Sequence, residues 1–124
     1  MFKDEVIHYF LKNRNLYPNI FPEFKIEVKS KLTHHFDAVF PGQTTEYVKA
    51  IKNININTAK NALFDWDDVE AYRNQTFDVN ARLNIITDNQ DDISDAVATM
   101  LSQYNVSVLS FHHKERLVQR FSNV

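Results

Sequence analysis

The chain has 124 residues, of which 44% are hydrophobic, 24% charged and 13% aromatic, and its formal net charge is −2. A chain of this length buries about two thirds of the surface that its unfolded form exposes, so it can build one core without disulfide or metal staples. It contains no cysteine and one glycine, which excludes disulfide frameworks, thiol nucleophiles, Cys-ligated zinc and glycine-rich nucleotide loops. We therefore expect a single domain over residues 1–124 that needs no cofactor.

The start of the sequence shows no targeting signal. Charged side chains begin at Lys3, unlike the apolar region of a secretory signal or a lipidation motif. No apolar run reaches the roughly 18 residues that a membrane span needs. The default expectation is a cytoplasmic protein with no membrane contact.

Charge is unevenly distributed along the chain. Residues 1–60 hold nine basic and six acidic side chains, whereas residues 61–124 hold five basic and ten acidic ones. The sequence lacks the basic stripe that neutralises phosphates in general nucleic-acid binders, so nucleic acid is not an expected partner. Opposite charge on two regions instead favours head-to-tail association of copies of the chain into a homo-oligomer.

The first third of the chain predicts a helix followed by extended structure. Apolar residues at helical spacing indicate an amphipathic helix over residues 2–11, which ends near residues 13–15 before two X-Pro pairs. Strict alternation over residues 24–29 predicts a strand with Lys25, Glu27 and Lys29 on its solvent face. The same parity continues to Phe40, so this region is either one long strand or two strands with a bend.

Residues 44–73 leave two alternatives open. Apolar spacing around residues 47–54 fits a helix, whereas Ile54 and Ile56 alternate as in a strand. Thr58 is a candidate cap for a helix that continues to Trp66, and the alternative is a loop before an edge strand near residues 69–71.

The last part of the chain gives sharper patterns. Residues 77–85 alternate and predict a strand with one face buried and one in solvent. Residues 93–104 follow helical spacing, with Asp88 or Asn89 as candidate N-caps. A strand is expected over residues 106–111, followed by a hairpin strand or a short helix. The predicted fold class is α+β, with an antiparallel sheet flanked by the N-terminal helix and a second helix near 91–104.

Two pairs of adjacent histidines raise the question of a metal site. They are His34–His35 and His112–His113. Adjacent residues of a strand point to opposite faces, so at most one of each pair can join a common site, with Asp37 as a possible carboxylate ligand. Structural histidines explain the pattern more simply, and we predict no metal, cofactor or catalytic residues.

Two further motifs contain acidic residues at suggestive spacing. Glu27-Val28-Lys29 has the Glu-x-Lys spacing of metal-dependent nucleases of the PD-(D/E)xK type, but no strand with a second acid precedes it. The run from Asp65 to Glu70 alternates acids like a calcium loop, yet it lacks the glycine and the closing glutamate of such loops. An acidic turn with Trp66 tucked into the core is the simpler interpretation.

The order of the predicted elements resembles the small tail-terminator and tail-completion proteins of tailed bacteriophages. The resemblance covers most of the chain as a pattern and matches no diagnostic motif, so no functional residue is carried over. It implies a non-enzymatic assembly protein that forms a ring through protein contacts, in the host cytoplasm and the virion. A small acidic inhibitor, such as a toxin-immunity or anti-defence protein, is the alternative hypothesis. A metal-dependent nuclease-like domain is the third.

Overall fold

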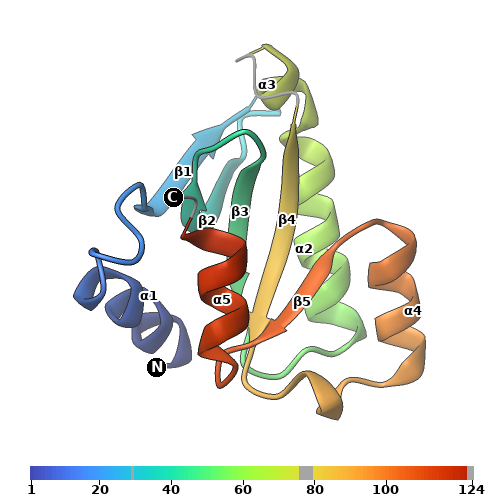
Figure 1. Ribbon diagram of the computed structural model, residues 1–124. Coiled ribbons are helices and arrows are strands. Elements are labelled where there is room, and N and C mark those ends of the chain that lie inside the picture. Colours follow the sequence, from blue (N-terminus) through green and yellow to red (C-terminus); the bar gives the residue numbers. More distant parts are fainter. Residues whose placement is uncertain (29, 76–79, 123–124) are drawn as a thin grey trace.

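The computed structural model describes residues 1–28, 30–75 and 80–122. These residues form one five-stranded sheet with helices on both faces, as Figure 1 shows. The strands are β1 (Phe21–Glu27), β2 (Thr33–Phe40), β3 (Thr45–Ala50), β4 (Ala81–Thr87) and β5 (Ser107–Ser110). The helices are α1 (Phe2–Lys12), α2 (Ile56–Asp68), α3 (Glu70–Gln75), the short 3₁₀ helix η1 (Gln90–Asp92), α4 (Asp95–Gln103) and α5 (Lys114–Phe121).

The sheet is mixed, and its strands lie in the order β1-β2-β3-β4-β5. The first three strands pair antiparallel, whereas β4 runs parallel to both β3 and β5. The α+β class and the N-terminal helix are confirmed, but the prediction of a purely antiparallel sheet is wrong. The reason is that α2 and α4 carry the chain back to the end of the sheet at which the previous strand began. The next strand therefore runs in the same direction.

Two hydrophobic clusters fill the space on the two faces of the sheet. Ala59 and Ala62 of α2 and Val97 and Leu101 of α4 pack on one face, against strand residues such as Leu83. On the other face, Phe10 of α1 and Phe121 of α5 pack with Phe40, which stacks on Phe121 with ring centroids 4.7 Å apart. The helices α1, α2, α4 and α5 each bury an apolar stripe, and the sheet is covered on both sides.

The prediction for the strand at residues 77–85 needs a correction. Residues 76–79 lie outside the described residues, and β4 begins at Ala81. Its residues from Leu83 to Thr87 are all buried, so over this part β4 has no solvent face, and only Arg82 near its start is exposed. Asn84 is fully buried because its side chain donates hydrogen bonds to Glu46 Oε1 and to the backbone oxygen of Tyr47. A central parallel strand between two helical layers is buried on both faces.

The ambiguous middle of the chain forms both a strand and a helix. Residues Thr45–Ala50 form β3, and α2 starts after Asn55, whose side chain accepts hydrogen bonds from the backbone N–H groups of Asn57 and Thr58. The Thr58 hydroxyl in turn accepts from the Asn55 N–H, so the predicted cap residue completes a capping box in its third position. The alternative prediction, a loop before an edge strand near residues 69–71, is wrong, because Glu70–Gln75 forms the helix α3.

The remaining sequence predictions fare better. The helices at residues 2–11 and 93–104 and the strand at 106–111 are confirmed, with small shifts at their ends. Ser94 caps α4, whereas Asn89 caps η1 before it. After β5 the chain forms the helix α5 rather than a hairpin strand. Within the described part of the chain, none of the helices has both the length and the apolarity that crossing a membrane requires.

Candidate functional site

The strands β2 and β3 separate at Asp37. Their pairing runs from Phe40 opposite Glu46 to Ala38 opposite Val48. Beyond that pair, the Asp37 side chain takes over, because its Oδ2 accepts a hydrogen bond of 2.7 Å from the Ala50 N–H. The sheet therefore forks at Asp37, and a carboxylate lies at the point where the fork opens.

The neighbouring strand is distorted at the same level. Glu23 of β1 lies between two residues paired with Phe36 and Ala38, and its φ angle is +50°. A left-handed conformation at a residue other than glycine costs about 1–2 kcal/mol. The side-chain alternation of β2 is also interrupted here. Phe36 and Ala38 are two residues apart and would normally face the same side of the sheet, but Phe36 belongs to one hydrophobic cluster and Ala38 to the other. Local strain of this kind is concentrated at functional sites, so it marks the fork as a candidate.

Two lysines flank the Asp37 carboxylate. Lys3 at the start of α1 places its Nζ 4.0 Å from Asp37 Oδ1. Lys49 of β3 donates a hydrogen bond of 3.0 Å to the backbone oxygen of His35 and also contacts the Asp65 carboxylate. The fork therefore brings together an acid and a cation from the neighbouring strands β2 and β3 and a second cation from α1, at the start of the chain.

A cavity of about 290 Å³ opens at this fork, between the sheet and the first half of α2. We call it the fork cavity. Its polar lining residues are Lys3, His35, Asp37, Lys49, Thr58, Asn61 and Asp65. It lies near the carboxyl end of β3, and that end of the strand is in the lower part of Figure 1. Ala50, Ile51 and Ala62 complete the lining. Because four of the polar side chains carry a charge, the cavity suits a charged ligand rather than an apolar one.

A buried histidine supports this arrangement from behind. His34 Nδ1 lies 2.9 Å from Asp65 Oδ1, and His34 Nε2 lies 2.6 Å from Asp68 Oδ2. Ionised carboxylates only accept hydrogen bonds, so each ring nitrogen carries a hydrogen when both acids are charged. Because Asp65 also contacts Lys49, it links the histidine to the cavity.

The two acids of this region differ in their acidity. Burial raises the pKa of Asp37, and the Ala50 N–H and the two lysines oppose that rise only in part. Hydrogen bonds from His34 and Ser30 hold the pKa of Asp68 below its usual value. An acid with a raised pKa in a polar cavity is a candidate functional group, whereas Asp68 acts as a structural partner of His34.

The fork cavity does not contain a complete metal site. Among the described residues, no three histidine, aspartate or glutamate side chains converge on a point where they would bind an ion. Asp37 already uses one oxygen to accept the Ala50 N–H. Mg²⁺ is commonly bound through one or two carboxylates together with substrate phosphates, and Asp37 would serve in that way only with a phosphate present.

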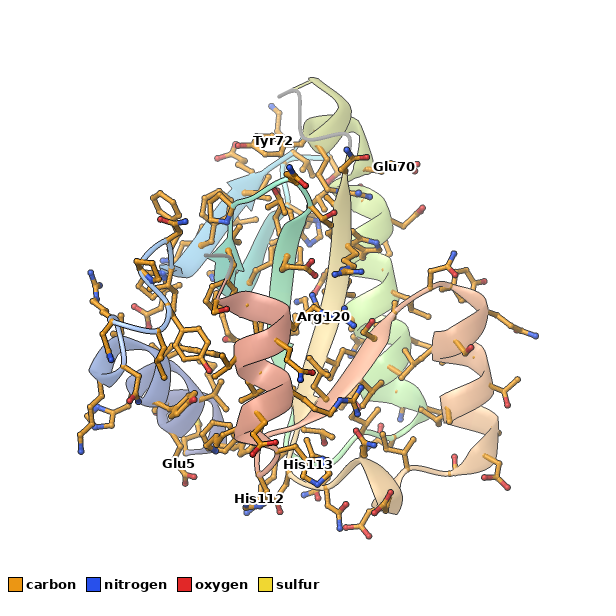
Figure 2. The ribbon with its side chains drawn as sticks, viewed as in Figure 1. Glu5, Glu70, Tyr72, His112, His113 and Arg120 are labelled. Atoms are coloured by element: carbon orange, nitrogen blue, oxygen red, sulfur yellow. The ribbon has the colours of Figure 1, made fainter. Side chains whose placement is uncertain are left out.

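The motifs singled out in the sequence do not build this site by themselves. Glu27 is exposed at the end of β1, and Lys29 lies outside the described residues. His112 is exposed and pairs with Asp88 at 2.9 Å, and Figure 2 shows it beside His113 at the start of α5. His35 lines the fork cavity, whereas neither His112 nor His113 does, so the two histidine pairs do not form one site there.

The acidic run from Asp65 to Glu70 is helical rather than a turn. It forms the last part of α2 and the start of α3. Trp66 packs against the core as expected, edge-on to Phe36, and the Arg73 guanidinium lies 3.7 Å from its ring centroid.

The sequence reasoning missed Lys49 as a site residue and named Asp37 only as an accessory. The available signal was a charged residue inside an apolar run, since Asp37 interrupts the sequence from Phe36 to Phe40. Lys49 likewise stands between Val48 and Ala50.

Several solved structures share this fold. AF1548, a protein of unknown function, aligns with a TM-score of 0.65 and 10% identity over 91% of this chain and 60% of its own. EndoMS in a complex with double-stranded DNA aligns with a TM-score of 0.59 and 9% identity, over 88% of this chain and 44% of its own. Can2 from Sulfobacillus thermosulfidooxidans, in complex with cyclic tetra-adenylate, gives 0.58 and 13% identity, over 99% of this chain and 36% of its own. The chain thus spans 60% or less of these proteins.

These matches contradict the function predicted from the sequence. The sequence predicts a non-enzymatic phage tail component for which nucleic acid is not a partner. The fold instead matches a protein solved with double-stranded DNA and another solved with a cyclic oligonucleotide. The predictions of a tail-assembly role, of no enzymatic activity and of no nucleic-acid partner are therefore wrong.

Sequence comparison identifies a family. No curated protein matches the chain. A family model does match, over residues 29–116, and its description is DUF1829, a domain of unknown function. The matched range contains Asp37, Lys49 and Asp65 of the fork cavity. Since it covers well over half of the 124 residues, the chain belongs to the DUF1829 family.

Proposed function

We propose that the chain is a nuclease-like domain that binds a phosphodiester of a nucleic acid or oligonucleotide in the fork cavity. The observation that carries this proposal is the placement of Asp37 between Lys3 and Lys49 at the β2–β3 fork. The match of the fold to structures containing double-stranded DNA and cyclic tetra-adenylate supports it.

The chemistry of the cavity fits a phosphate group. Lys3 and Lys49 provide ammonium groups that would neutralise the phosphate oxygens and the charge that develops on them during hydrolysis. Thr58 and Asn61 add neutral hydrogen-bonding groups on the opposite wall. The Asp65 carboxylate fixes Lys49, so this cation is held in place before a ligand arrives.

Asp37 is the residue that would act on the attacking water. Its raised pKa makes its carboxylate a better proton acceptor than an exposed aspartate, because a general base works best when its pKa approaches the working pH. With a divalent cation present, the same carboxylate oxygen would instead help the bound phosphate to hold the cation, which would supply Lewis-acid assistance in place of this proton transfer.

The net charge of the chain predicts the character of binding. At −2, the whole molecule does not attract nucleic acid, so affinity must arise locally from the cations of the cavity. If two phosphate contacts are neutralised, the logarithm of the binding constant falls with the logarithm of salt concentration with a slope of roughly −2.

The test is to measure binding and cleavage separately. Duplex DNA, single-stranded DNA, RNA and cyclic tetra-adenylate are each incubated with the protein and Mg²⁺ or Mn²⁺, and products are resolved on gels. Binding is followed by fluorescence anisotropy. We expect one of these substrates to be bound and cleaved. Asp37→Asn is expected to reduce cleavage by about 100-fold or more, in line with the loss of a general base.

Matched controls separate the cavity from general charge effects. Lys49→Gln is compared with Lys25→Gln, because Lys25 is exposed on β1 outside the cavity. Asp37→Asn is compared with Asp92→Asn, whose side chain is exposed in η1. Equal activity in the cavity variants and their controls, or neither binding nor cleavage by the natural chain, would overturn the proposal.

Binding without cleavage is the second candidate function. The absence of three converging metal ligands among the described side chains favours it. In that case the natural chain binds one of the substrates, Lys49→Gln weakens the binding, and no condition produces cleavage.

A further inference from the structure

A second polar cavity lies at the opposite end of strand β3 from the fork cavity. It has a volume of about 210 Å³, and besides Phe40 its lining residues are polar: Gln43, Thr44, Glu46, Arg82, Gln119 and Arg120. We call it the arginine cavity. It lies where β3 and β4 start and where α5 ends, and Figure 2 shows Arg120 on α5 next to β4. It shares no residue with the fork cavity.

The charges of this cavity do not balance. Glu46 is buried, and both of its carboxylate oxygens accept hydrogen bonds from Arg82 Nε, at 2.6 and 2.7 Å. Arg120 Nη1 lies 3.9 Å from the same carboxylate. One negative charge therefore faces two guanidinium groups, and one positive charge is left over.

Much of the hydrogen-bonding capacity of these arginines is available for a ligand. Arg120 donates from Nη1 to Asn84 Oδ1 at 2.9 Å and to Ser107 Oγ at 3.0 Å. Arg82 donates from Nε alone to described residues. A guanidinium carries five N–H groups in a planar fork. The other N–H groups of both side chains make no hydrogen bond to the described part of the chain, while 45% of the Arg82 side chain and 22% of the Arg120 side chain remain accessible.

Neighbouring groups add to the positive potential. Burial lowers the pKa of Arg120, and the positive charges of Arg82 and Arg116 lower it further, whereas Glu46 raises it. These groups repel one another in the absence of a counter-charge. An anion placed between them would remove this repulsion.

We infer that the arginine cavity binds a phosphate oxyanion between Arg82 and Arg120. Guanidinium groups recognise phosphate through paired N–H donors, and this pairing is stronger and more specific than contact with a single ammonium group. Thr44, Gln43 and Gln119 supply neutral hydrogen-bonding groups around it. The inference does not depend on the proposed function, because the arginine cavity lies at the opposite end of β3 and shares no residue with the fork cavity.

The variant that tests the cavity must leave the buried Glu46 network intact. Gln119 is exposed in the last turn of α5 and lines the cavity, so Gln119→Glu adds a negative charge at the cavity without removing a partner of Glu46. Gln103 is exposed at the end of α4 and does not line the cavity, so Gln103→Glu is the matched control for a new charge at a helix end.

The measurement is the thermal stabilisation of the protein by inorganic phosphate at constant ionic strength, with chloride as the compensating salt. Lys49→Gln is present in every sample, so that the fork cavity contributes little. Phosphate is expected to raise the melting temperature in a concentration-dependent way, because a ligand that binds the folded state stabilises it. Gln119→Glu is expected to weaken the apparent affinity by about tenfold or more, and Gln103→Glu by less than twofold.

The source of the phosphate is separated in the same assay. A mononucleotide 5′-phosphate, a 5′-hydroxyl oligonucleotide and a 5′-phosphorylated one are compared by the rise in melting temperature that each produces. Stabilisation by the ligands with a terminal phosphate alone assigns a free or terminal phosphate, whereas equal stabilisation by both oligonucleotides assigns the backbone. The inference is overturned if phosphate fails to stabilise the Lys49→Gln protein or stabilises the Gln119→Glu and Gln103→Glu proteins equally.

Discussion

The Asp37 carboxylate and the Ala50 N–H are joined by a 2.7 Å hydrogen bond across the fork between β2 and β3. This bond replaces a strand-to-strand contact where the ladder has ended. It fixes the carboxylate to the backbone and keeps it half-buried, with 14% of the side chain accessible. The position of the group is therefore set by the sheet, while its charge is costly because of its burial.

Replacing Asp37 by asparagine should stabilise the protein at neutral pH. An amide oxygen can still accept the Ala50 N–H, and the buried charge is gone. Because the pKa of Asp37 is raised by folding, the natural chain gains stability as the pH falls through the folded pKa towards the unfolded value of 3.8. The advantage of Asp37→Asn should thus shrink as the pH is lowered from 7 to 4.

Urea denaturation at several pH values measures this difference. Asp92→Asn, in an exposed position of η1, is the control. A lower free energy of unfolding for Asp37→Asn than for the natural chain at pH 7 would contradict the argument. Greater stability combined with lost activity would be the behaviour expected of a functional group that costs stability.

The parts of the fold with one buried face were predictable from the sequence. The helices α1 and α4 each show a clear apolar stripe. The ends of α1 were located within one residue, whereas the helix predicted near 91–104 begins only at Asp95, because residues Gln90–Asp92 form the separate helix η1. The strand β4 was predicted to have one face in solvent, because a polar residue such as Asn84 in an alternating sequence indicates a solvent-facing position. Its partners Glu46 and Tyr47 lie more than 35 residues earlier, and the sequence gives no sign of that pairing.

The candidate site was less predictable than the fold. It depends on the register of β2 and β3, which brings Asp37 next to Ala50. It also depends on the packing of α2, whose side chains form one wall of the fork cavity. The acids at Asp65 and Asp68 were visible as a cluster, but their partner is His34, about thirty residues earlier. Long-range pairing of this kind cannot be read from local periodicity.

The aromatic cluster between α1, α5 and the sheet should dominate stability. Phe121 is 1% exposed, stacks on Phe40 and meets Phe10 edge-on with ring centroids 5.9 Å apart. Phe121→Ala is expected to lower the free energy of unfolding by about 3–5 kcal/mol, through lost burial and the cavity left behind. Chemical denaturation measures this loss.

Phe64→Ala is the matched control for the aromatic cluster, because Phe64 is 57% exposed on α2. It is expected to change the free energy of unfolding by about 0.5 kcal/mol or less. Similar losses in both variants would show that the cluster is not the source of the stability.

The pairing of His34 with Asp68 predicts a specific sensitivity to acid. The pKa of Asp68 is lowered in the folded state, so its contribution to stability is complete above the unfolded value of 3.8 and is lost as the pH falls through the folded value. Asp68→Asn should remove that part of the acid-induced loss. Thermal melts between pH 5 and pH 2 measure it, with the exposed neighbour Asp67→Asn as control. An unchanged acid profile in Asp68→Asn would exclude this pair as its source.

The start of α2 depends on the capping box of Asn55 and Thr58. Asn55→Ala leaves the N–H groups of Asn57 and Thr58 without their acceptor, and the expected loss in the free energy of unfolding is about 0.5–2 kcal/mol. Asn53→Ala, exposed in the preceding loop, should change it far less. Equal losses in the two variants, measured in urea, would argue against the cap.

Asp65 offers a way to separate the position of Lys49 from its charge. Its two oxygens contact His34 and Lys49, so Asp65→Asn weakens both contacts while the lysine and its charge remain. Hydrogen bonds to charged groups contribute about 1.5–3 kcal/mol, and a loss in this range is expected in the free energy of unfolding.

For the binding measured by fluorescence anisotropy, Asp65→Asn should behave differently from Lys49→Gln. With Asp65→Asn the dependence on salt should keep its slope, because the number of cations in the cavity is unchanged, whereas Lys49→Gln should reduce the slope by about one unit. An unchanged slope in Lys49→Gln would show that Lys49 is not the phosphate-binding cation. A reduction of about one unit in both variants would show that the lysine reaches the phosphate only when Asp65 holds it, and would contradict the expectation for Asp65→Asn.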